Sequence, residues 1–524
     1  MRLNRRGVGD TTSEREPRDS RRRPFLGLIA ALLALAMLAA ACGDSGGGNN
    51  EAESTTSGPA ATEAPATTAA PGTTEAPATT EAAPTESAQP MAGQTIKFWS
   101  TETQPERLAA TQKIIDRFTA QTGINVQLTA ADEDQLPQLM LVNAASGTLP
   151  DVVFHPVDFT VGWANQGLLD MDAANEVVQE LGADTFSQGA LGLATVDGKV
   201  AAVPSDGWGQ LLLYRKDIFD AKGLDAPDTF DKIMNAAKTL NDPSNDFYGI
   251  TAATDASAVF TQQTFEQFAL ANNCQLTDDA GNVTLDSPEC VEAISFYTDL
   301  LGNYSPAGVQ DVVSTRATYF AGQAGMIVWS PFILDEMAGL RDSALPTCPE
   351  CGDDPAYLAK NTGIVPAFAG PSGSPAQYGQ VSLMGIGTGA NTEAAKAFVK
   401  FWLSDGYLDW LAVSPEGKFP MRRGNAESAT AYIDGWKNLE TGVDRKAKLS
   451  DFYSDDVIQT LIEGSNNFQR WGFAQGQGEL VTAIYQALYV PKALRDVLDG
   501  VETPEQAATT IAEQAKEEQD LLSE

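Results

Sequence analysis

Short apolar strand patterns alternate with amphipathic helix patterns from residue 94 onward, and this alternation constrains the fold more than any other feature. Residues 95–99 and 124–128 indicate strands, and residues 110–118 between them repeat apolar side chains at the spacing of one helix face. A third short apolar strand pattern follows at 151–154. Strands that alternate with helices favour a parallel α/β sheet, in which ligands bind beyond the carboxyl ends of the strands.

Polar and aromatic residues follow each of these three strand patterns. They are Trp99–Glu102, Ala131–Asp134 and His155–Pro156. Because ligand sites form at the carboxyl edge of such a sheet, we expect this set to converge there. The second half of the chain is richer in helix patterns, which cover residues 230–240, 257–271, 288–301, 393–403, 452–463, 478–498 and 503–523.

The segment 1–41 has the marks of a signal peptide. Eight Arg lie within residues 2–23, and the apolar run that follows ends in small residues directly before Cys42. This arrangement resembles a bacterial lipobox, in which the signal peptidase cuts before the cysteine and the thiol carries a diacylglycerol. Leu38 lies one place further from Cys42 than the lipobox has it, so ordinary secretion without lipid is the alternative. The Arg pair at 22–23 also resembles the twin-arginine export motif.

Residues 44–93 lack the composition of a packed domain. They consist mostly of Ala, Thr, Pro, Glu, Gly and Ser, with no Lys or Arg and almost no large apolar side chain. Such a segment buries too little surface to offset its ordering entropy, so residues 42–93 are predicted to be a disordered tether that begins at the lipid-anchor cysteine. In a polyproline-like state of roughly 3 Å per residue, about 50 residues reach at most on the order of 150 Å.

The charge balance excludes two classes of partner. The chain has 70 acidic and 34 basic residues, a formal net charge of −36, and 8 of the Arg residues lie in the segment 1–41. Such a surface repels nucleic acid and anionic lipid head groups. Hydrophobic residues make up 43% of the 524 residues, which is ample for a core. The length indicates two folded units once the N-terminal segments are removed.

Four cysteines remain beside Cys42, which in an exported chain indicates two disulfides. Cys274 and Cys290 flank a turn-rich stretch and are the natural pair. Cys348 and Cys351 have the CxxC spacing, for which a structural disulfide, a redox site and a zinc site compete. We favour the disulfide, because no strand-to-helix context supports a redox site and a single His leaves too few zinc ligands. No metal is expected.

Seven segments of the chain, taken in order, together form a pattern that is typical of one protein family. In chain order the segments are 95–118, 149–153, 198–204 with 213–219, 320–326, 370–373, 395–402 and 419–422. This series resembles the extracellular solute-binding proteins of carbohydrate ABC importers, the maltose-binding-protein-like family 1. No single string is specific, but the order is, and the resemblance covers about four fifths of the chain.

The resemblance implies a two-lobe periplasmic-binding-protein-like α/β fold with hinge crossings and a ligand cleft between the lobes. By analogy the crossings fall near 204–208, 328–334 and 384–390. Lobe I is then expected to comprise 94–205 plus 332–386, and lobe II 206–331 plus 387–524. Closure is a hinge motion, and the solute shifts the population toward the closed state because both lobes contact it only there.

Sugars present apolar C–H faces to aromatic rings and hydroxyl groups to polar side chains. Four of the eight Trp lie in polar segments with Gly or Ser, where a ring can face a cleft, whereas Trp402 and Trp410 are expected in the core. The predicted sugar platforms are Trp99, Trp208, Trp329 and Trp471, with a core or rim position as the alternative. The predicted hydroxyl ligands are Glu102, Asp134, Asp206 and Arg423, with a solvated surface charge as the alternative.

The segment Gly385–Gly389 follows a strand pattern and precedes a helix pattern, as a dinucleotide-binding loop does. The third glycine of the GxGxxG motif is missing, and no βαβ unit with a matching acidic residue is evident. We interpret the segment as a flexible lobe crossing, and we expect no cofactor.

We therefore predict an extracellular solute-binding lipoprotein, not an enzyme. It would be a monomer held at the outer face of the cell membrane by the lipid on Cys42. It would deliver a sugar or oligosaccharide to the transmembrane subunits of an ABC transporter. A secreted glycoside hydrolase is one alternative, although no motif indicates the two carboxylates that it needs. A wall-associated sensor or adhesin is another, although no internal repeat favours it. The sequence leaves the solute open.

Overall fold

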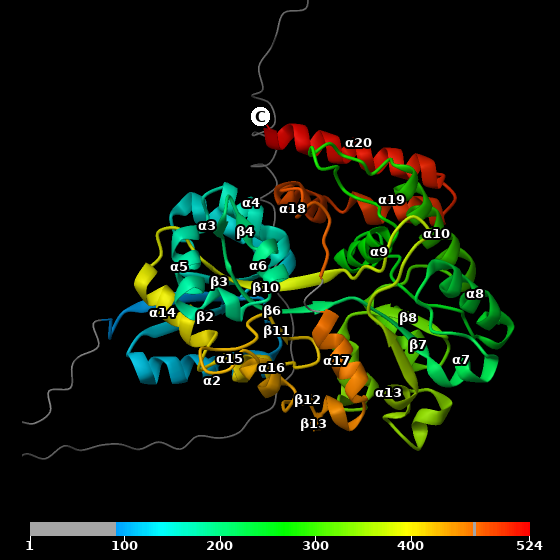
Figure 1. Cartoon of the computed structure of the whole chain (residues 1–524), viewed down its shortest axis with the longest axis horizontal. Coiled ribbons are helices and arrows are strands. Elements are labelled where there is room, and N and C mark those ends of the chain that lie inside the picture. Colours follow the sequence, from blue (N-terminus) through cyan, green and yellow to red (C-terminus); the bar gives the residue numbers. More distant parts are fainter. Residues whose placement is uncertain (1–90, 465–467, 524) are drawn as a thin grey trace, which may run out of the picture. The chain divides into compact units, whose positions relative to one another are not determined.

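The computed structural model describes residues 91–464 and 468–523, which belong to one compact unit of the chain (Figure 1). The predicted signal peptide, Cys42 and nearly all of the predicted tether lie outside the described residues. Within the described part, no helix combines the length and apolar character needed to span a membrane. The fold is mixed α/β with two lobes, as predicted.

Lobe I is built on a six-stranded sheet with the strand order β11-β6-β10-β3-β1-β2. Strand β1 lies between β2 and β3 and pairs with both in parallel, whereas β10 is antiparallel to β3 and β6. The parallel pairing of the three strands expected from the sequence is thereby confirmed. The strands are β1 (Thr95–Ser100), β2 (Asn125–Ala130), β3 (Val152–Pro156), β6 (Val203–Gly209), β10 (Gly379–Ile386) and β11 (Phe419–Pro420).

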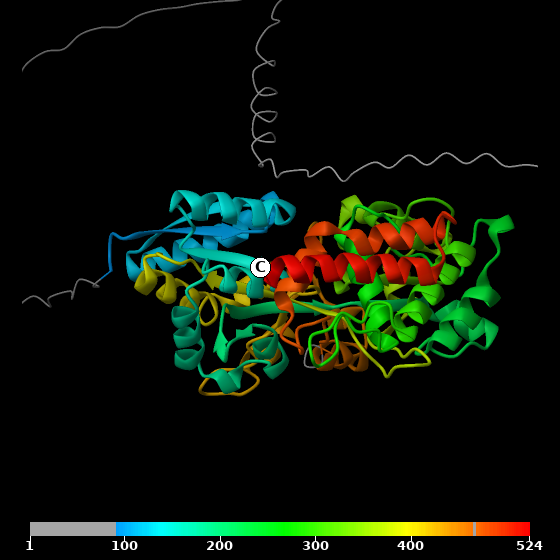
Figure 2. The same ribbon diagram turned by 90° about the horizontal axis from the view of Figure 1, so that it is seen from above.

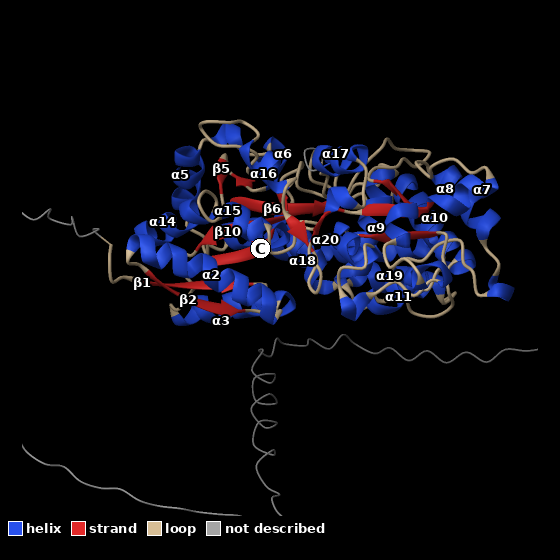
Figure 3. Ribbon diagram, turned by 90° about the horizontal axis from the view of Figure 1, so that it is seen from below, coloured by secondary structure: helices blue, strands red, loops and turns tan. Residues whose placement is uncertain are grey.

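Helices α2, α5, α6, α14 and α16 of lobe I pack against this sheet. In α2 the first residue is Pro105, whose fixed φ suits a helix start, and the helix ends at Gly123, which adopts a φ of 72°. Figure 3 shows α5 and α6 on one side of the lobe and α2 and α3 on the other. The helices are α2 (Pro105–Thr122), α3 (Leu136–Ser146), α4 (Thr160–Asn165), α5 (Met171–Leu181), α6 (Gln188–Leu193), α14 (Thr392–Trp402), α15 (Tyr407–Leu411) and α16 (Ala431–Trp436).

Lobe II has a three-stranded antiparallel sheet in the order β8-β7-β9, made of β7 (Leu211–Arg215), β8 (Met326–Trp329) and β9 (Thr362–Val365). Helices dominate this lobe, and Figure 2 shows the long C-terminal α20 lying beside them. They are α7 (Lys216–Lys222), α8 (Phe230–Leu240), α9 (Val259–Ala271), α10 (Pro288–Tyr304), α11 (Val312–Phe320), α12 (Leu334–Met337), α13 (Tyr357–Asn361), α18 (Gly478–Ala487), α19 (Tyr489–Leu498) and α20 (Pro504–Ser523).

Two short hairpins and one helix complete the described part. The hairpins pair β4 (Thr195–Val196) with β5 (Lys199–Val200) and β12 (Glu440–Thr441) with β13 (Ala447–Lys448). The helix is α17 (Asp455–Gly464), whose Ile458, Leu461 and Ile462 are buried.

Strands β6 and β10 carry the chain between the lobes. Only Gln210 separates β6 from β7, and β10 begins where Gly379 pairs with Gly209. The expected crossing at 384–390 differs from this: that segment begins at the carboxyl end of β10, deep in the lobe I sheet, and Gly385 pairs with Val153. The Gly385–Gly389 loop is therefore a turn within lobe I rather than a lobe crossing.

Lobe membership also differs from the expected ranges in several elements, of which β9 and α14 are examples. Strand β9, from the segment 332–386, pairs with β7 in lobe II. Helix α14, from the segment 387–524, belongs to lobe I, because its Phe398 packs edge-on against Phe98 and Phe118, with ring centroids 5.2 and 5.1 Å apart. The lobe against which an apolar face packs depends on tertiary contacts, and the order of the elements in the sequence does not reveal it.

The predicted helices agree closely with the observed ones, with one break. Residues 230–240 form α8 as expected, but 478–498 forms two helices, α18 and α19. Leu488 between them is left-handed, with a φ of 54°. Pro491 explains the break, since it has no N–H to donate to Ala487 and its ring crowds that carbonyl group.

Both predicted disulfides are present. Cys274 bonds to Cys290, and Cys348 bonds to Cys351. Among the described residues, no group of His, Cys, Asp and Glu side chains has the arrangement of a metal site. The Cys348–Cys351 bond agrees with the predicted pairing, and a purely structural role for it stays a prediction.

Candidate functional site

A cavity of about 390 Å³ lies between the two lobes and draws its walls from both. Lobe I contributes residues of α2 and the end of β6, and lobe II contributes residues of α9, α11 and the end of β8. The lining residues are Gln104, Arg107, Trp208, Gln210, Phe260, Gln263, Val312, Arg316, Trp329, Ser330, Phe332, Glu336 and Arg341. We call this cavity the aromatic cleft.

Aromatic rings from different elements meet in the aromatic cleft. Trp208 is near the end of β6, and its ring lies edge-on to that of Phe332, with centroids 6.5 Å apart. Trp329 is the last residue of β8, and its ring is edge-on to Phe260 at 4.8 Å. Edge-to-face packing holds such rings rigidly, so they form a preformed surface for an apolar face of a ligand.

Charged groups on the lobe I side are tied into a buried network. Arg107 donates to Glu102 (3.0 Å) and to Ser414 Oγ (2.8 Å), and its guanidinium stacks over Phe332 at 5.5 Å. Lys418 Nζ lies 2.7 Å from the other oxygen of Glu102. Burial alone would raise the pKa of Glu102, but Lys418 and Arg107 outweigh it and lower that pKa to about 2. Glu102 therefore stays ionised and fixes Arg107 at the cleft wall.

On the lobe II side, Arg316 of α11 pairs with Glu336 of α12 at 2.8 Å. Both residues line the aromatic cleft. Burial raises the pKa of Glu336, and the nearby Arg316 opposes that rise. Together with Gln210 and Gln263, this pair offers hydrogen-bond donors and acceptors to a ligand whose apolar face lies on the rings.

A second cavity, of about 750 Å³, continues from the aromatic cleft. The two share Phe260, Gln263 and Val312. Its far walls are α3 of lobe I and α18, with Asp158 and Gln380 among the lining residues. The space between the lobes is thus a long groove with one aromatic end.

Comparison with known proteins agrees with this geometry. The sequence model of the bacterial extracellular solute-binding protein family matches residues 101–408. The chain is also 30% identical over 409 residues to the putative ABC transporter periplasmic-binding protein YcjN of Escherichia coli K12, covering 76% of this chain and 89% of that protein. The chain belongs to the bacterial extracellular solute-binding proteins.

One more distant relative of this solute-binding protein and one solved structure of similar fold are described with a ligand. The maltotriose-binding protein of Pyrococcus abyssi is 24% identical over 316 residues, covering 60% of this chain and 61% of that one. The structure of maltose-bound MalE3 of T. maritima superimposes with a TM-score of 0.62 at 21% identity, over 80% of this chain and 99% of that chain. The second likeness shows the two-lobe fold.

The structure brings two of the predicted site residues of this solute-binding protein together. Trp208 and Trp329 line the aromatic cleft from opposite lobes. Glu102 lies behind that wall and reaches the cleft through Arg107. Asp206 is only 2% exposed and is held by Trp410 Nε1 at 2.5 Å, so its carboxylate serves the interior of lobe I.

The other predicted residues lie elsewhere. Trp471 differs most from its prediction: it is 1% exposed, and its indole N–H donates to the carbonyl of Cys274 (2.8 Å) in the core of lobe II. Trp99 is half-buried against the lobe I core and does not line the described cavities, and neither does Arg423. The side chain of Asp134 lies outside what the structure describes.

Several cleft residues escaped prediction because their sequence signal is that of an ordinary helix surface. Arg107 and Arg316 lie on helices among other polar residues, and Phe260 and Gln263 begin α9. Phe332 follows Trp329 closely, and proximity to a predicted platform is the one signal that could have singled it out. The others become cleft residues only when the lobes are assembled.

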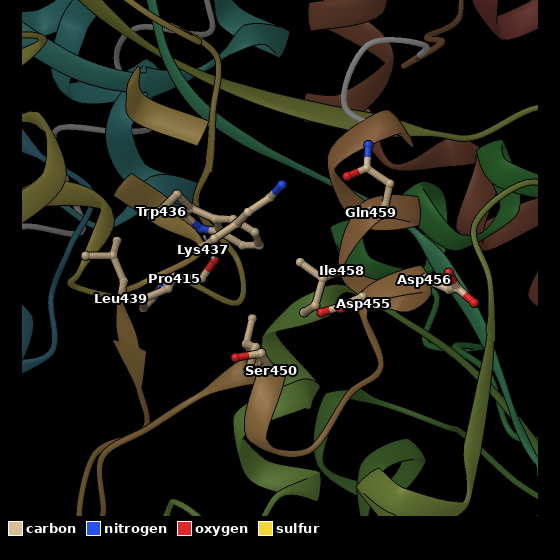
Figure 4. Close-up of a pocket in the computed structure, with 10 residues that line it drawn as sticks. Pro415, Trp436, Lys437, Leu439, Ser450, Asp455, Asp456, Ile458 and Gln459 are labelled. Carbon is tan, nitrogen blue, oxygen red and sulfur yellow. Dashed lines mark hydrogen bonds between the residues drawn. The ribbon is translucent and has the colours of Figure 1, made fainter. Parts of the chain in front are cut away.

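A further cavity, of about 560 Å³, lies between α16 and α17 (Figure 4). Trp436 and Leu439 line one side of it, and Ile458 faces them from α17. Trp436 is only 2% exposed and donates to the carbonyl of Pro415 (2.9 Å), so its ring is committed to packing. This cavity shares no lining residue with the groove among the described residues.

Proposed function

We propose that this solute-binding protein captures a neutral sugar or oligosaccharide in the groove between its lobes and delivers it to the transmembrane subunits of an ABC importer. The observation that carries the proposal is the aromatic cleft, in which Trp208 of lobe I and Trp329 of lobe II flank arginine, glutamine and carboxylate side chains. Rings for apolar C–H faces and fixed polar groups for hydroxyls are what a sugar requires.

The names of the relatives support a carbohydrate ligand, since one binds maltotriose and another was solved with maltose. The proposal includes no catalysis: the protein would bind and release its ligand unchanged. It also includes a lipid on Cys42 and a tether at 42–93, which would hold the lobes outside the membrane as a monomer.

A thermal-shift screen over mono-, di- and trisaccharides and polyols tests the proposal. A ligand that binds only the native state raises the melting temperature, because it stabilises that state. At a ligand concentration of 100 times the Kd, this stabilisation is about 2.7 kcal/mol. The same sugars are then incubated with the protein and analysed by chromatography. Binding without any change in the sugar supports the proposal. Released hydrolysis products, or a panel without a single shift, would refute it.

The membrane anchor is tested separately. Metabolic labelling with a fatty-acid analogue should mark the wild-type protein, and Cys42→Ser should abolish the label and release the protein into the medium. A labelled Cys42→Ser protein would contradict the anchor without bearing on the sugar site.

A further inference from the structure

A fourth cavity, of about 290 Å³, extends the groove beyond the aromatic cleft. It shares Arg107 and Arg341 with the cleft, so the two spaces are neighbours. One wall is α2 and the residues after α15 in lobe I, and the other is α12 with residues 442–446. At about 30 Å³ of liquid volume per water molecule, the space suits a single hexose-sized unit rather than one or two waters.

One buried carboxyl group in this cavity lacks the hydrogen-bond partners that buried polar groups ordinarily have. Asp335 of α12 lines the wall and is 1% exposed, yet neither of its carboxylate oxygens has a hydrogen-bond partner among the described residues. The nearest cation, Arg341, places Nε 3.8 Å from Oδ2, which is too far for a hydrogen bond. Nearly all buried polar groups in native proteins are paired, so an orphan that lines a cavity marks a place for a missing partner.

The neighbouring carboxylate of Glu416 differs from Asp335 because it has hydrogen-bond partners. Glu416 is equally buried, but its oxygens accept hydrogen bonds from Ser414 Oγ (2.6 Å) and from Thr441 Oγ1. Burial raises the pKa of Asp335 to about 8, and the charge of Glu416 adds to that rise. At neutral pH the Asp335 carboxyl group therefore keeps a proton and can both donate and accept a hydrogen bond, as a hydroxyl partner requires.

We propose that this cavity is a further subsite of the groove, which holds one neutral, hydroxylated unit of a bound oligosaccharide on Asp335. The inference rests on the proposed function and deepens it, because a ligand that occupies both the aromatic cleft and this cavity has more than one sugar unit.

Charged groups of both signs line the cavity and can bind hydroxyl groups. Four cations line it, Arg107, Lys113, Arg341 and Lys446, and three carboxyl groups accompany them, Glu106, Asp335 and Glu416. Because groups of both signs line the cavity, a ligand of either charge would face like-charged as well as oppositely charged groups. A neutral unit with several hydroxyl groups can accept hydrogen bonds from the cations and donate them to the carboxylates, and it adds no net charge to the cavity.

The test is isothermal titration of the full mature protein with maltose, maltotriose, maltotetraose, cellobiose and cellotriose. We expect affinity to increase with chain length in at least one series. Asp335→Ala should remove that gain, with about a tenfold loss for the longer ligand and little change for the disaccharide, because one buried hydrogen bond is lost. Asp335→Asn keeps a donor and an acceptor in the same shape and should retain most of the gain.

Two further variants separate binding from folding. Val443→Trp fills the cavity from its partly exposed rim without changing Asp335, and it should also remove the chain-length gain. Asp279→Ala, at an exposed turn of lobe II, should leave all affinities unchanged.

The outcomes distinguish this inference from the proposed function. If sugars bind but Asp335→Ala and Val443→Trp leave the chain-length dependence intact, the subsite is refuted while the proposed function stands. If none of the five oligosaccharides binds and the wider sugar panel also gives no shift, both are refuted.

Discussion

Arg470 occupies the centre of a buried ion cluster that joins the two lobes. Its guanidinium donates to Glu266 Oε1 (3.1 Å), to Gln380 Oε1 (2.9 Å) and to Asp158. Asp158 belongs to lobe I and Glu266 to α9 of lobe II, and all three charged side chains are at most 4% exposed. We predict that replacing Arg470 is among the most destabilising single changes available in this protein.

The magnitude follows from what Arg470→Met leaves behind. Both carboxylates lose their only cation in the cluster, while Glu266 keeps hydrogen bonds from the Trp471 N–H (2.8 Å) and the Tyr485 hydroxyl (2.5 Å). The volume is nearly conserved, so cavity formation adds little. Removing one partner of a buried ion pair costs about 3–5 kcal/mol, and we expect the unfolding free energy to fall by that amount.

Urea unfolding, followed by tryptophan fluorescence and circular dichroism, measures the change. Arg495→Met is the matched control: it removes a partly exposed pair with Asp499 four residues away and should cost less than about 1 kcal/mol. The double variant Arg470→Met/Glu266→Gln should regain part of the loss, because it leaves one buried charge fewer. If Arg470→Met were within about 1 kcal/mol of the wild type, the cluster would not stabilise the lobe junction as we reason.

Three further predictions concern the cleft, a disulfide and pH. Trp329→Leu should weaken sugar binding by about 2 kcal/mol in calorimetry, whereas Trp436→Phe, outside the groove, should not; equal losses would contradict the cleft assignment. Cys274→Ser opens a disulfide with a sequence separation of 16 and should lower the unfolding free energy by about 3 kcal/mol; unchanged urea midpoints would contradict this. Burial raises the pKa of Asp335 from 3.8 to about 8, so the folded state keeps a proton that the unfolded chain releases. Its contribution to stability should therefore decline as pH rises from about 4 to 8, and a wild-type pH profile that Asp335→Asn leaves unchanged would refute this.

The sequence by itself determined the local elements and the family. The strand at 95–99 and the helix at 230–240 follow from apolar periodicity, because each needs only one buried face to be specified, and the strand at 151–154 follows from a short continuous apolar run that is buried on both faces. The two disulfides followed from short spacing across turns, which leaves few alternative partners. Seven weak motifs in a fixed order sufficed to indicate the solute-binding family.

Only the tertiary structure decided which side chains face the groove. Trp208 and Trp471 have similar polar and glycine-containing neighbours in the sequence, yet one lines the aromatic cleft and the other is sealed in lobe II. Exposure depends on the elements that pack on a residue, and these come from distant parts of the chain. Arg107 and Asp335 became visible as binding groups for the same reason: the lobes, not the local pattern, enclose them.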